Sequence, residues 1–490
     1  DTLDEYQARS NGKLTFQIIQ PQEGSADEAS TTDGEDQEAS SIEETARGYG
    51  CEKVLVGERS EDRASVRKVF KCMAFKRGDE VAVIPDLQIA GRGAFANLEY
   101  EITKHLLNMH SAEPRTIGFV KGYGGISDQP QFIKQMQGAY EQLQGGLIEA
   151  TSVDLSGDDP TIPDDVDALV ILNPENTFSD GATFAIDQFV QRGGSVGWYQ
   201  SPTALDRQMM QRFAQQMQGQ RPPRIRKDVD PGLAPLFESW GIRHNKDLLL
   251  DYENGLTAQA LTPSGIQQIT LPATFQMNDL DRRLPFLQGF SSIALPTPSS
   301  VELTESVEAT NAITGYKAIQ TRPTAIRVID IPKQFNYQTF EEELDGQKGT
   351  YTVAAALQGD IPSYYDDNPL PEGKTRDDLV ADASAPGRVL VVGSGDFLQS
   401  QQQVGFDGGL VQISQQFFFS STEWLAQDTS LTQIRSKSMP TLLPKVDLET
   451  QRMVQFINIA MVPAVFAAFG LLMYWRRGRR RERISRKFEE

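Results

Sequence analysis

Apolar runs of two different kinds alternate along the middle of the chain. Short continuous runs, typical of buried strands, are separated by longer segments whose apolar positions recur every three or four residues, as in amphipathic helices. The strand candidates are residues 116–120, 148–155, 168–172 and 195–199, and the helix candidates are residues 132–143 and 181–192. Strands that alternate with helices predict a Rossmann-like α/β domain built on a parallel sheet. We place its first part at residues 113–246.

Capping residues bracket the second helix candidate of this region. Asp180 stands directly before it, and an aspartate there can accept hydrogen bonds from the free N–H groups of the first turn. Gly193-Gly194 follows it, and glycine readily adopts the left-handed conformation that ends many helices. The pattern therefore predicts a helix that begins after Asp180 and stops at Gly193.

The same pattern returns near the C-terminus. Residues 388–392 form an apolar strand candidate, residues 393–396 its exit loop, and residues 412–425 a helix candidate. We expect this closing part of the α/β domain, residues 386–432, to rejoin the first sheet. Between the two parts, residues 247–385 are rich in short strand-like pieces and turn residues, which predicts a β-rich insertion.

A smaller α+β subdomain is predicted at residues 1–112. Its helix candidates are residues 4–10 and 98–109, and its strand candidates are residues 13–20, 53–56, 66–75 and 80–84. Residues 23–44 hold nine acidic residues and no Lys or Arg, which favours a solvated loop. Because the chain begins with Asp1 rather than Met, we expect that a segment preceded it.

The strongest single signal lies near the end of the chain. Residues 456–475 are apolar except for Asn458, and a helix of this length can cross a hydrocarbon core of about 30 Å. A linker at residues 433–455 precedes this stretch, and a basic tail at residues 476–490 follows it. The bias of positive charge predicts a cytoplasmic tail and an inner-membrane protein whose large domain lies on the periplasmic side. The residues of this positive-inside anchor are Arg476, Arg477, Arg479, Arg480, Arg481 and Arg483.

Charge and cysteine content narrow the classes of partner. The formal net charge is −20 although the tail is basic, so the body is more acidic than the total suggests and should repel nucleic acid. Cys51 and Cys72 are the two cysteines, and each stands beside a strand candidate. A disulfide between them and two reduced thiols both remain open, because sequence does not fix the distance between their Cα atoms.

Motifs for nucleotide or metal chemistry are incomplete. Gly373-Lys374-Thr375 resembles the end of a phosphate-binding loop, but Asn368 stands where that motif needs its first glycine. Gly122-Tyr123-Gly124-Gly125 lacks the third glycine of a dinucleotide fingerprint. The three histidines, His105, His110 and His244, show no zinc-ligand spacing. We therefore expect no cofactor and no metal.

Candidate nucleophiles lack a nearby base in the sequence. Ser201 and Ser394 follow strand candidates, but each would need a histidine brought in from afar. We therefore expect a protein that is not an enzyme. An envelope hydrolase with the same fold remains an alternative, and it requires a clustered Ser, His and Asp.

A series of short motifs resembles the GldG-type auxiliary component of gliding-motility-associated ABC transporters. They run from the N-terminus to about residue 436: Asp4-Glu5-Tyr6, Ser10-Asn11-Gly12-Lys13, Leu98-Glu99-Tyr100-Glu101, Ile117-Gly118-Phe119, Asp167-Ala168-Leu169-Val170-Ile171, residues 185–194, Gly241-Ile242, Asn245-Lys246-Asp247, residues 391–397 and Trp424-Leu425-Ala426. The resemblance implies an extracytoplasmic body with an amidotransferase-like α/β domain that lacks catalytic residues, and membrane helices at both ends. It also implies an ABC permease and a cytoplasmic ATPase as partners. Family members often show Gly-His-Gly-Glu where this chain has Gly122-Tyr123-Gly124-Gly125, so a role tied to that His or Glu does not carry over.

Function is then expected to lie in binding. Ligands of open α/β sheets sit at the carboxyl ends of the strands, which nominates Tyr123, Asn173 and Asp396 as ligand-binding candidates. We expect a non-catalytic, membrane-anchored accessory subunit whose body binds substrate, envelope partners or another copy of itself. A structural scaffold of an envelope motility or pilus machine is the other alternative.

Overall fold

The chain divides into two compact units, Asp1–Thr441 and Leu442–Glu490. The structure, a computed structural model, describes residues 2–18, 44, 46–51, 53–60, 63–70, 72–84, 98–109, 114–144, 147–216, 224–262, 265–305, 307, 312–335, 338–340, 342–380, 385–398, 408–426, 469–470 and 473–474. Of the predicted acidic loop at 23–44 only Glu44 is described, and the predicted linker and basic tail lie outside the described residues.

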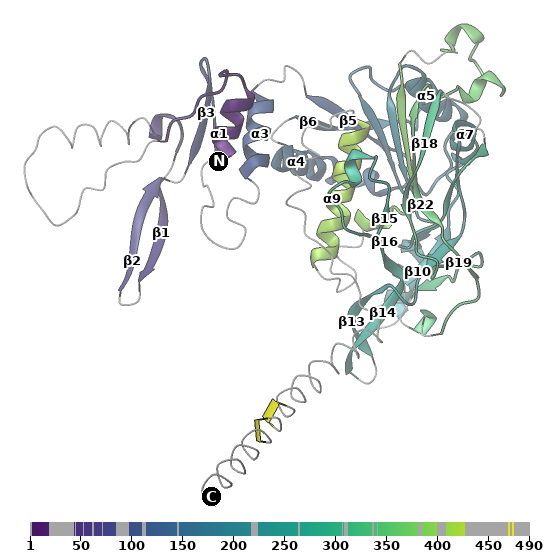
Figure 1. Cartoon of the computed structure of the whole chain (residues 1–490). Helices are drawn as coiled ribbons and strands as arrows, with labels where there is room; N and C mark the ends of the chain where they lie inside the picture. Colours follow the sequence, from purple (N-terminus) through teal and green to yellow (C-terminus); the bar gives the residue numbers. More distant parts are fainter. Residues whose placement is uncertain are drawn as a thin grey trace, which may run out of the picture. The chain divides into compact units, whose positions relative to one another are not determined.

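The described elements of the N-terminal part include helices and two hairpins (Figure 1). The elements are α1 (Thr2–Arg9), β1 (Lys53–Ser60), β2 (Arg63–Phe70), β3 (Met73–Arg77), β4 (Glu80–Ile84) and α3 (Leu98–Asn108). β1 pairs with β2, and β3 with β4, both antiparallel. The strand predicted at residues 13–20 is wrong where it can be compared, because residues 14–18 are not in a strand.

A disulfide joins Cys51 to Cys72, whose Cα atoms are 5.9 Å apart. Cys72 lies between β2 and β3, so the bond ties the start of the first hairpin to the start of the second. The alternative that the sequence left open, two reduced thiols, is not the state of this structure.

An eight-stranded sheet forms the centre of the α/β body. Its order is β15 (Asp279–Leu280), β18 (Ile313–Gln320), β22 (Thr352–Gly359), β23 (Gly387–Val392), β8 (Ser195–Tyr199), β7 (Ala168–Leu172), β5 (Arg115–Lys121) and β6 (Ile148–Asp154). The five strands from β23 to β6 are parallel, and the three from β15 to β22 are antiparallel. The mostly parallel sheet agrees with the α/β prediction, and β23 rejoins it beside β8 as expected.

Helices cover both faces of this sheet, which explains its apolar strands. Every residue of β7 and β8 is buried, as in parallel strands that are covered on both sides. Successive side chains of a strand point to opposite faces. The Trp198 ring lies 4.8 Å from Phe237 of α7 (Ala234–Trp240), whereas the ring of the next residue, Tyr199, lies 5.3 Å from Phe418 of α9 (Gly408–Leu425). The helices α7 and α9 therefore lie on opposite faces.

The helix α5 (Asp180–Gln191) shows where the sequence prediction of its cap failed. Ser179 is the N-cap, since its hydroxyl accepts from the backbone N–H of Ala182 at 3.2 Å, and Asp180 is already inside the first turn. The helix ends as predicted before Gly193, which has a φ of +91°. Both Ser and Asp are good N-cap residues, so the sequence alone did not choose between adjacent positions.

The β-rich range contributes both to the central sheet and to small antiparallel sheets. It supplies β15, β18 and β22 to the central sheet. Other helices and strands that the structure describes in the body are α4 (Phe132–Gln144), β9 (Thr203–Leu205), α6 (Arg207–Gln216), β10 (Arg224–Asp228), β11 (Ile242–His244), β12 (Leu248–Leu250), β13 (Gly255–Thr262), β14 (Gly265–Met277), β16 (Ile293–Pro296), β17 (Val301–Leu303), β19 (Ile326–Val328), β20 (Gln334–Phe335) and β21 (Gln347–Lys348).

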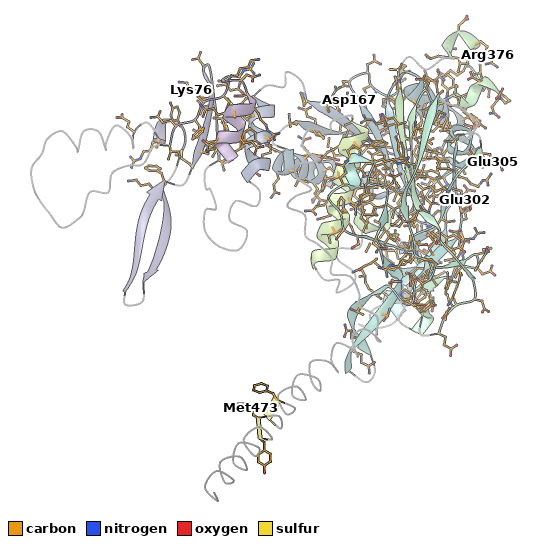
Figure 2. The ribbon with its side chains drawn as sticks, viewed as in Figure 1. Lys76, Asp167, Glu302, Glu305, Arg376 and Met473 are labelled. Carbon is orange, nitrogen blue, oxygen red and sulfur yellow. A yellow bond between two sulfur atoms is a disulfide. The ribbon has the colours of Figure 1, made fainter. Side chains whose placement is uncertain are left out.

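In the second unit, four residues of the predicted span are described: Phe469, Gly470, Met473 and Tyr474. All four are helical, and the large apolar side chains are solvent-exposed; Met473 is labelled in Figure 2. No helix within the described part of the chain has both the length and the apolar character needed to cross a membrane.

A buried carboxylate ties α5 to a distant loop. Asp187 accepts hydrogen bonds from Ser363 Oγ at 2.7 Å, Tyr364 N at 2.8 Å and Trp240 Nε1 at 3.4 Å. Burial raises the pKa of Asp187, because desolvation disfavours its charged form more than these donors stabilise it. The carboxyl group thus holds the segment after β22 against the helix face.

We expect Asp187→Ala to lower the free energy of unfolding by about 3 kcal/mol, since it leaves these three donors and Gln188 Nε2, which donates at 2.8 Å, without their buried acceptor. Ser363→Ala is the matched control, because it removes one hydroxyl and should cost about 1 kcal/mol. Urea unfolding followed by tryptophan fluorescence measures both values. Equal costs for the two variants would contradict a role of Asp187 as the shared acceptor.

Candidate functional site

The order of the parallel strands locates the place where a ligand site would be expected. From β6 to β23 the order is β6-β5-β7-β8-β23, so the chain runs outward in opposite directions from β5 and β7. In doubly wound sheets of this order, ligands bind at the carboxyl ends of the strands beside that reversal. Tyr123 follows β5, Asn173 follows β7 and Asp396 follows β23, so all three nominated residues lie at the carboxyl edge.

The loop after β5 binds its own carboxylate. Gly122 N and Gly124 N donate to the two oxygens of Asp128, at 2.5 and 2.6 Å. Both glycines have positive φ, +100° and +79°, and so adopt a conformation that other residues rarely tolerate. Consecutive backbone N–H groups in such a loop commonly bind an external anion. Here Asp128 takes that position, which leaves these donors engaged.

Tyr123 has a packing role. Its ring stacks on Phe178 with centroids 3.7 Å apart, and its hydroxyl donates to the carbonyl oxygen of Leu155 at 2.8 Å. Its own carbonyl oxygen accepts from the backbone N–H groups of Glu175 and Asn176. The side chain is buried, so it joins the loop after β5 to the loop after β7.

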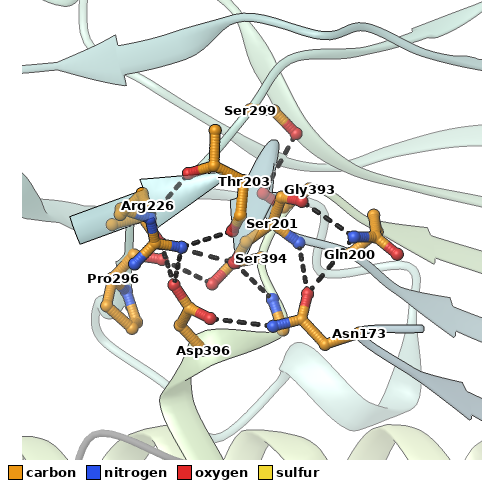
Figure 3. Close-up of polar contacts among 12 residues, drawn as sticks. Asn173, Gln200, Ser201, Thr203, Arg226, Pro296, Ser299, Gly393, Ser394 and Asp396 are labelled. Carbon is orange, nitrogen blue, oxygen red and sulfur yellow. Dashed lines mark hydrogen bonds and ion pairs between the residues drawn. The ribbon is translucent and has the colours of Figure 1, made fainter. Parts of the chain in front are cut away.

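Asn173 and Asp396 are brought together, although 223 positions separate them (Figure 3). Asn173 Nδ2 donates to Asp396 Oδ1 at 2.8 Å. Asn173 Oδ1 in turn accepts from the backbone N–H of Ser201 at 2.8 Å, at the exit of β8. One asparagine side chain therefore links the carboxyl ends of β7, β8 and β23.

Arg226 completes this network from β10. Its Nη2 forms an ion pair with Asp396 Oδ2 at 2.5 Å, and its Nε donates to Thr203 Oγ1 at 2.6 Å. Thr297 Oγ1 donates to the same carboxylate oxygen at 2.6 Å. Arg226 and Asp396 are 6% and 7% exposed, so the pair is largely buried. We call Asn173, Ser201, Thr203, Arg226, Thr297 and Asp396 the carboxyl-edge network.

Two members of the network have a strained backbone. Asn173 has a φ of +46° and Thr297 a φ of +45°. Asparagine tolerates the left-handed region, but for a β-branched residue such as threonine it is unusual. Strain of this kind costs about 1–3 kcal/mol per residue and persists where surrounding contacts fix the conformation. The hydrogen bonds of both side chains supply such contacts.

Two glycines in the loop after β23 allow this loop to lie close to Asn173 and Ser299. A Cβ at Gly395 would lie 2.7 Å from Asn173 Oδ1, and a Cβ at Gly393 would lie 2.1 Å from the carbonyl oxygen of Ser299. Neither contact is tolerable, so only glycine fits at these positions. The sequence Gly393-Ser394-Gly395-Asp396 is thus explained by packing against the neighbouring loops.

The hydroxyl groups of the two candidate nucleophiles, Ser201 and Ser394, are buried and hydrogen-bonded to the backbone of other loops. Ser394 Oγ donates to the carbonyl oxygen of Pro296 at 2.6 Å, and Ser201 Oγ accepts from Gly395 N at 3.1 Å. Neither side chain has exposed surface. The network therefore uses these hydroxyls to hold loops together.

A serine and a histidine that the sequence did not pair do meet. His244 Nε2 lies 2.8 Å from Ser299 Oγ and 3.1 Å from the carbonyl oxygen of Gln200. In the tautomer that carries its proton on Nε2, the ring can donate to this carbonyl oxygen, which only accepts, and Nε2 cannot then take the proton of Ser299. The Ser299 hydroxyl can instead donate to the carbonyl oxygen of Gly393, at 3.1 Å. Burial lowers the pKa of His244 to about 4, so the ring is neutral at pH 7.

The other motifs fall at unrelated places. Lys374 of the phosphate-loop-like triplet forms an ion pair with Asp159 at 2.8 Å, and Thr375 caps a short helical turn with Asp378. His105 stacks on Phe75. His110 lies outside the described residues. Within the parts of the chain that the structure describes, no three His, Cys, Asp or Glu side chains are grouped to hold a metal ion.

Removing one partner of the buried ion pair should be costly. We expect Asp396→Ala to lower the free energy of unfolding by about 3–5 kcal/mol, because it leaves the Arg226 guanidinium buried without a counter-charge. The double variant with Arg226→Met should lose less than the sum of the two single losses. As a control, Asp230→Ala removes an exposed ion pair with Lys246 and should cost about 0–1 kcal/mol. Additive losses in urea unfolding would show that the pair is not coupled.

Protonation of His244 should lower the free energy of unfolding as the pH falls from about 6.5 toward 4. Its folded pKa of about 4 lies below the unfolded value of 6.5, so its contribution is complete above pH 6.5 and is lost as pH falls toward 4. Between pH 7 and pH 5 this amounts to about 2 kcal/mol. His244→Gln keeps a donor for Gln200 but does not titrate. Unfolding curves at the two pH values should therefore show a smaller loss for the variant, and an equal loss would contradict the assignment.

Comparisons with known proteins place the body in a family. The family model for an auxiliary component, described as ABC-type uncharacterized transport system, matches residues 114–426. No curated protein matches the sequence. Among solved structures, the mmIFT52 N-terminal domain is 11% identical with a TM-score of 0.33, over 63% of this chain and 96% of that chain. A putative ThuA-like protein from Bacteroides uniformis ATCC 8492 is 9% identical with a TM-score of 0.30, over 64% and 93%. Because the family match covers more than half of its length, the chain belongs to this family and is an auxiliary component of an ABC-type transport system.

Proposed function

We propose that this protein is a non-catalytic, membrane-anchored accessory subunit that couples its transport system to a binding event outside the cytoplasm. The observation that carries the proposal is the extent of the family match, which runs from the start of β5 to the end of α9 and so takes in the whole α/β body. The finer assignment to GldG-type components of gliding-motility-associated transporters rests on the sequence motifs quoted above.

The carboxyl-edge network supports coupling by contact rather than by chemistry. Its side chains are hydrogen-bonded to one another, and its central residues, Asn173, Arg226 and Asp396, are buried. A fully bonded buried network makes the surrounding loops rigid. We infer that Asn173 and Asp396 stabilise the body, as Tyr123 does beside them, and that partners bind elsewhere on its surface.

Two features support a location outside the cytoplasm. The disulfide between Cys51 and Cys72 is of a kind that persists in oxidising compartments such as the periplasm. The apolar stretch at 456–475 with the basic tail after it would hold the body to the inner membrane. ATP-driven movement of the permease would then reach the body through this anchor.

Affinity purification of the tagged, full-length protein from its native membrane in mild detergent tests the proposal. We expect mass spectrometry to find an ABC ATPase and a multi-span permease at near-stoichiometric levels. Recovery of envelope scaffold proteins without these subunits would contradict the proposal and favour a structural scaffold. Asp230→Ala, an exposed change, serves as the control for recovery of an intact body.

A further inference from the structure

One edge of the central sheet has an open stretch of backbone. β18 pairs with β22 along its length on one side. On its other side, β15 pairs with it only at Gln320 and Ile319, and Asp281 N adds one bond to the carbonyl oxygen of Ala318 at 3.0 Å. Among the strands that the structure describes, none pairs with residues 313–317 on that side. These residues form the open edge.

The opposite edge of the same sheet carries a side-chain cap. Its outermost strand, β6, has the backbone N–H of Ala150 bonded to Gln137 Oε1 of α4 at 2.7 Å. Unpaired strand edges are templates for pairing with another chain, and proteins usually cover or cap them. Because β6 carries a side-chain cap, the open edge at residues 313–317 of β18 requires an explanation.

A groove of about 590 Å³ runs along the open edge. One wall is apolar and consists of Leu303, Val307 and Ile313. Gly315 lies in this groove, and a Cβ there would come within 2.7 Å of Val307 Cγ1 and 3.1 Å of Leu303 Cδ1. The absence of a side chain at Gly315 thus lets Val307 and Leu303 pack closely against the strand.

The other part of the groove carries charges of both signs. Asp281 and Arg283 form an ion pair at 2.6 Å, whereas Asp279 and Lys317 have no ion pair among the described residues. The two aspartates would repel a polyanion such as nucleic acid or an acidic lipid surface. An extended polypeptide offers what the groove lacks: backbone donors and acceptors for β18, an apolar side chain for the wall, and an acidic side chain for Lys317.

We propose that the open edge of β18 binds an extended extracytoplasmic segment of the transport system's permease, which adds one strand to the sheet. The inference rests on the proposed function, since that function supplies the partner. The segment places an apolar residue against Leu303 and Val307 and a carboxylate beside Lys317.

Site-specific photo-crosslinking in native membranes tests the proposal with the full-length protein. A benzophenone amino acid replaces Thr314, which is exposed on the open edge, and the control replaces Glu149, which is exposed on β6. We expect an adduct with the permease, identified by mass spectrometry, from position 314 and none from position 149. Lys317→Glu should reduce the adduct by about fivefold, because it turns an ion pair into a repulsion. Since Lys317 is exposed, the unfolding midpoint of the Lys317→Glu variant should equal that of the unchanged protein.

Each other outcome overturns a defined part of the argument. If the permease and ATPase co-purify but position 314 gives no permease adduct, the open edge is not the binding site and the proposed function stands. An adduct between two copies of this chain overturns the permease segment in favour of self-association. If the transport subunits do not co-purify with the unchanged protein, the proposed function fails and the inference fails with it.

Discussion

The body depends on one buried ion pair, between Arg226 and Asp396. Removing either charge from water costs several kcal/mol, so neither can stay in the interior without the other and without further hydrogen bonds. Thr203 supplies those bonds to the guanidinium, and Asn173 and Thr297 supply them to the carboxylate. The network members come from the exits of β7, β8 and β23, from β9 and β10, and from the loop after β16, so a single set of bonds fixes segments that are far apart in the sequence.

This constraint decides what the carboxyl edge can do. In a doubly wound domain this edge usually leaves a crevice for a ligand. Here Asp128 occupies the N–H groups after β5, and Arg226 occupies the carboxylate after β23. The groups that would recognise a small molecule are bonded to the protein itself. Bonds within the protein therefore hold the carboxyl edge together, which supports the proposal that the body acts by contact.

The sequence predicted what local pattern determines. β7 and β8 have the predicted bounds, because a short apolar run covered on both faces is unambiguous. The sequence placed Asn173 and Asp396 at the carboxyl edge but did not predict that they contact each other. No local pattern pointed to Arg226 or Thr297 as their partners. Likewise, the contact of His244, the last residue of β11, with Ser299, in the connection between β16 and β17, arises from tertiary packing. Gly393 and Gly395, whose absence of side chains permits the close approach, were the one local signal of the network.

The three antiparallel strands explain why the sheet has an open edge at all. A parallel strand needs a crossover helix, which also covers a face of the sheet, whereas antiparallel strands can extend it with short connections. β22 and β18 extend the sheet in this way, and β15 is too short to cover the last strand. A longer β15 would have closed the edge as simply as Gln137 caps β6. A sheet whose last strand is left unpaired over residues 313–317, beside a groove, is suited to take a further strand from a partner.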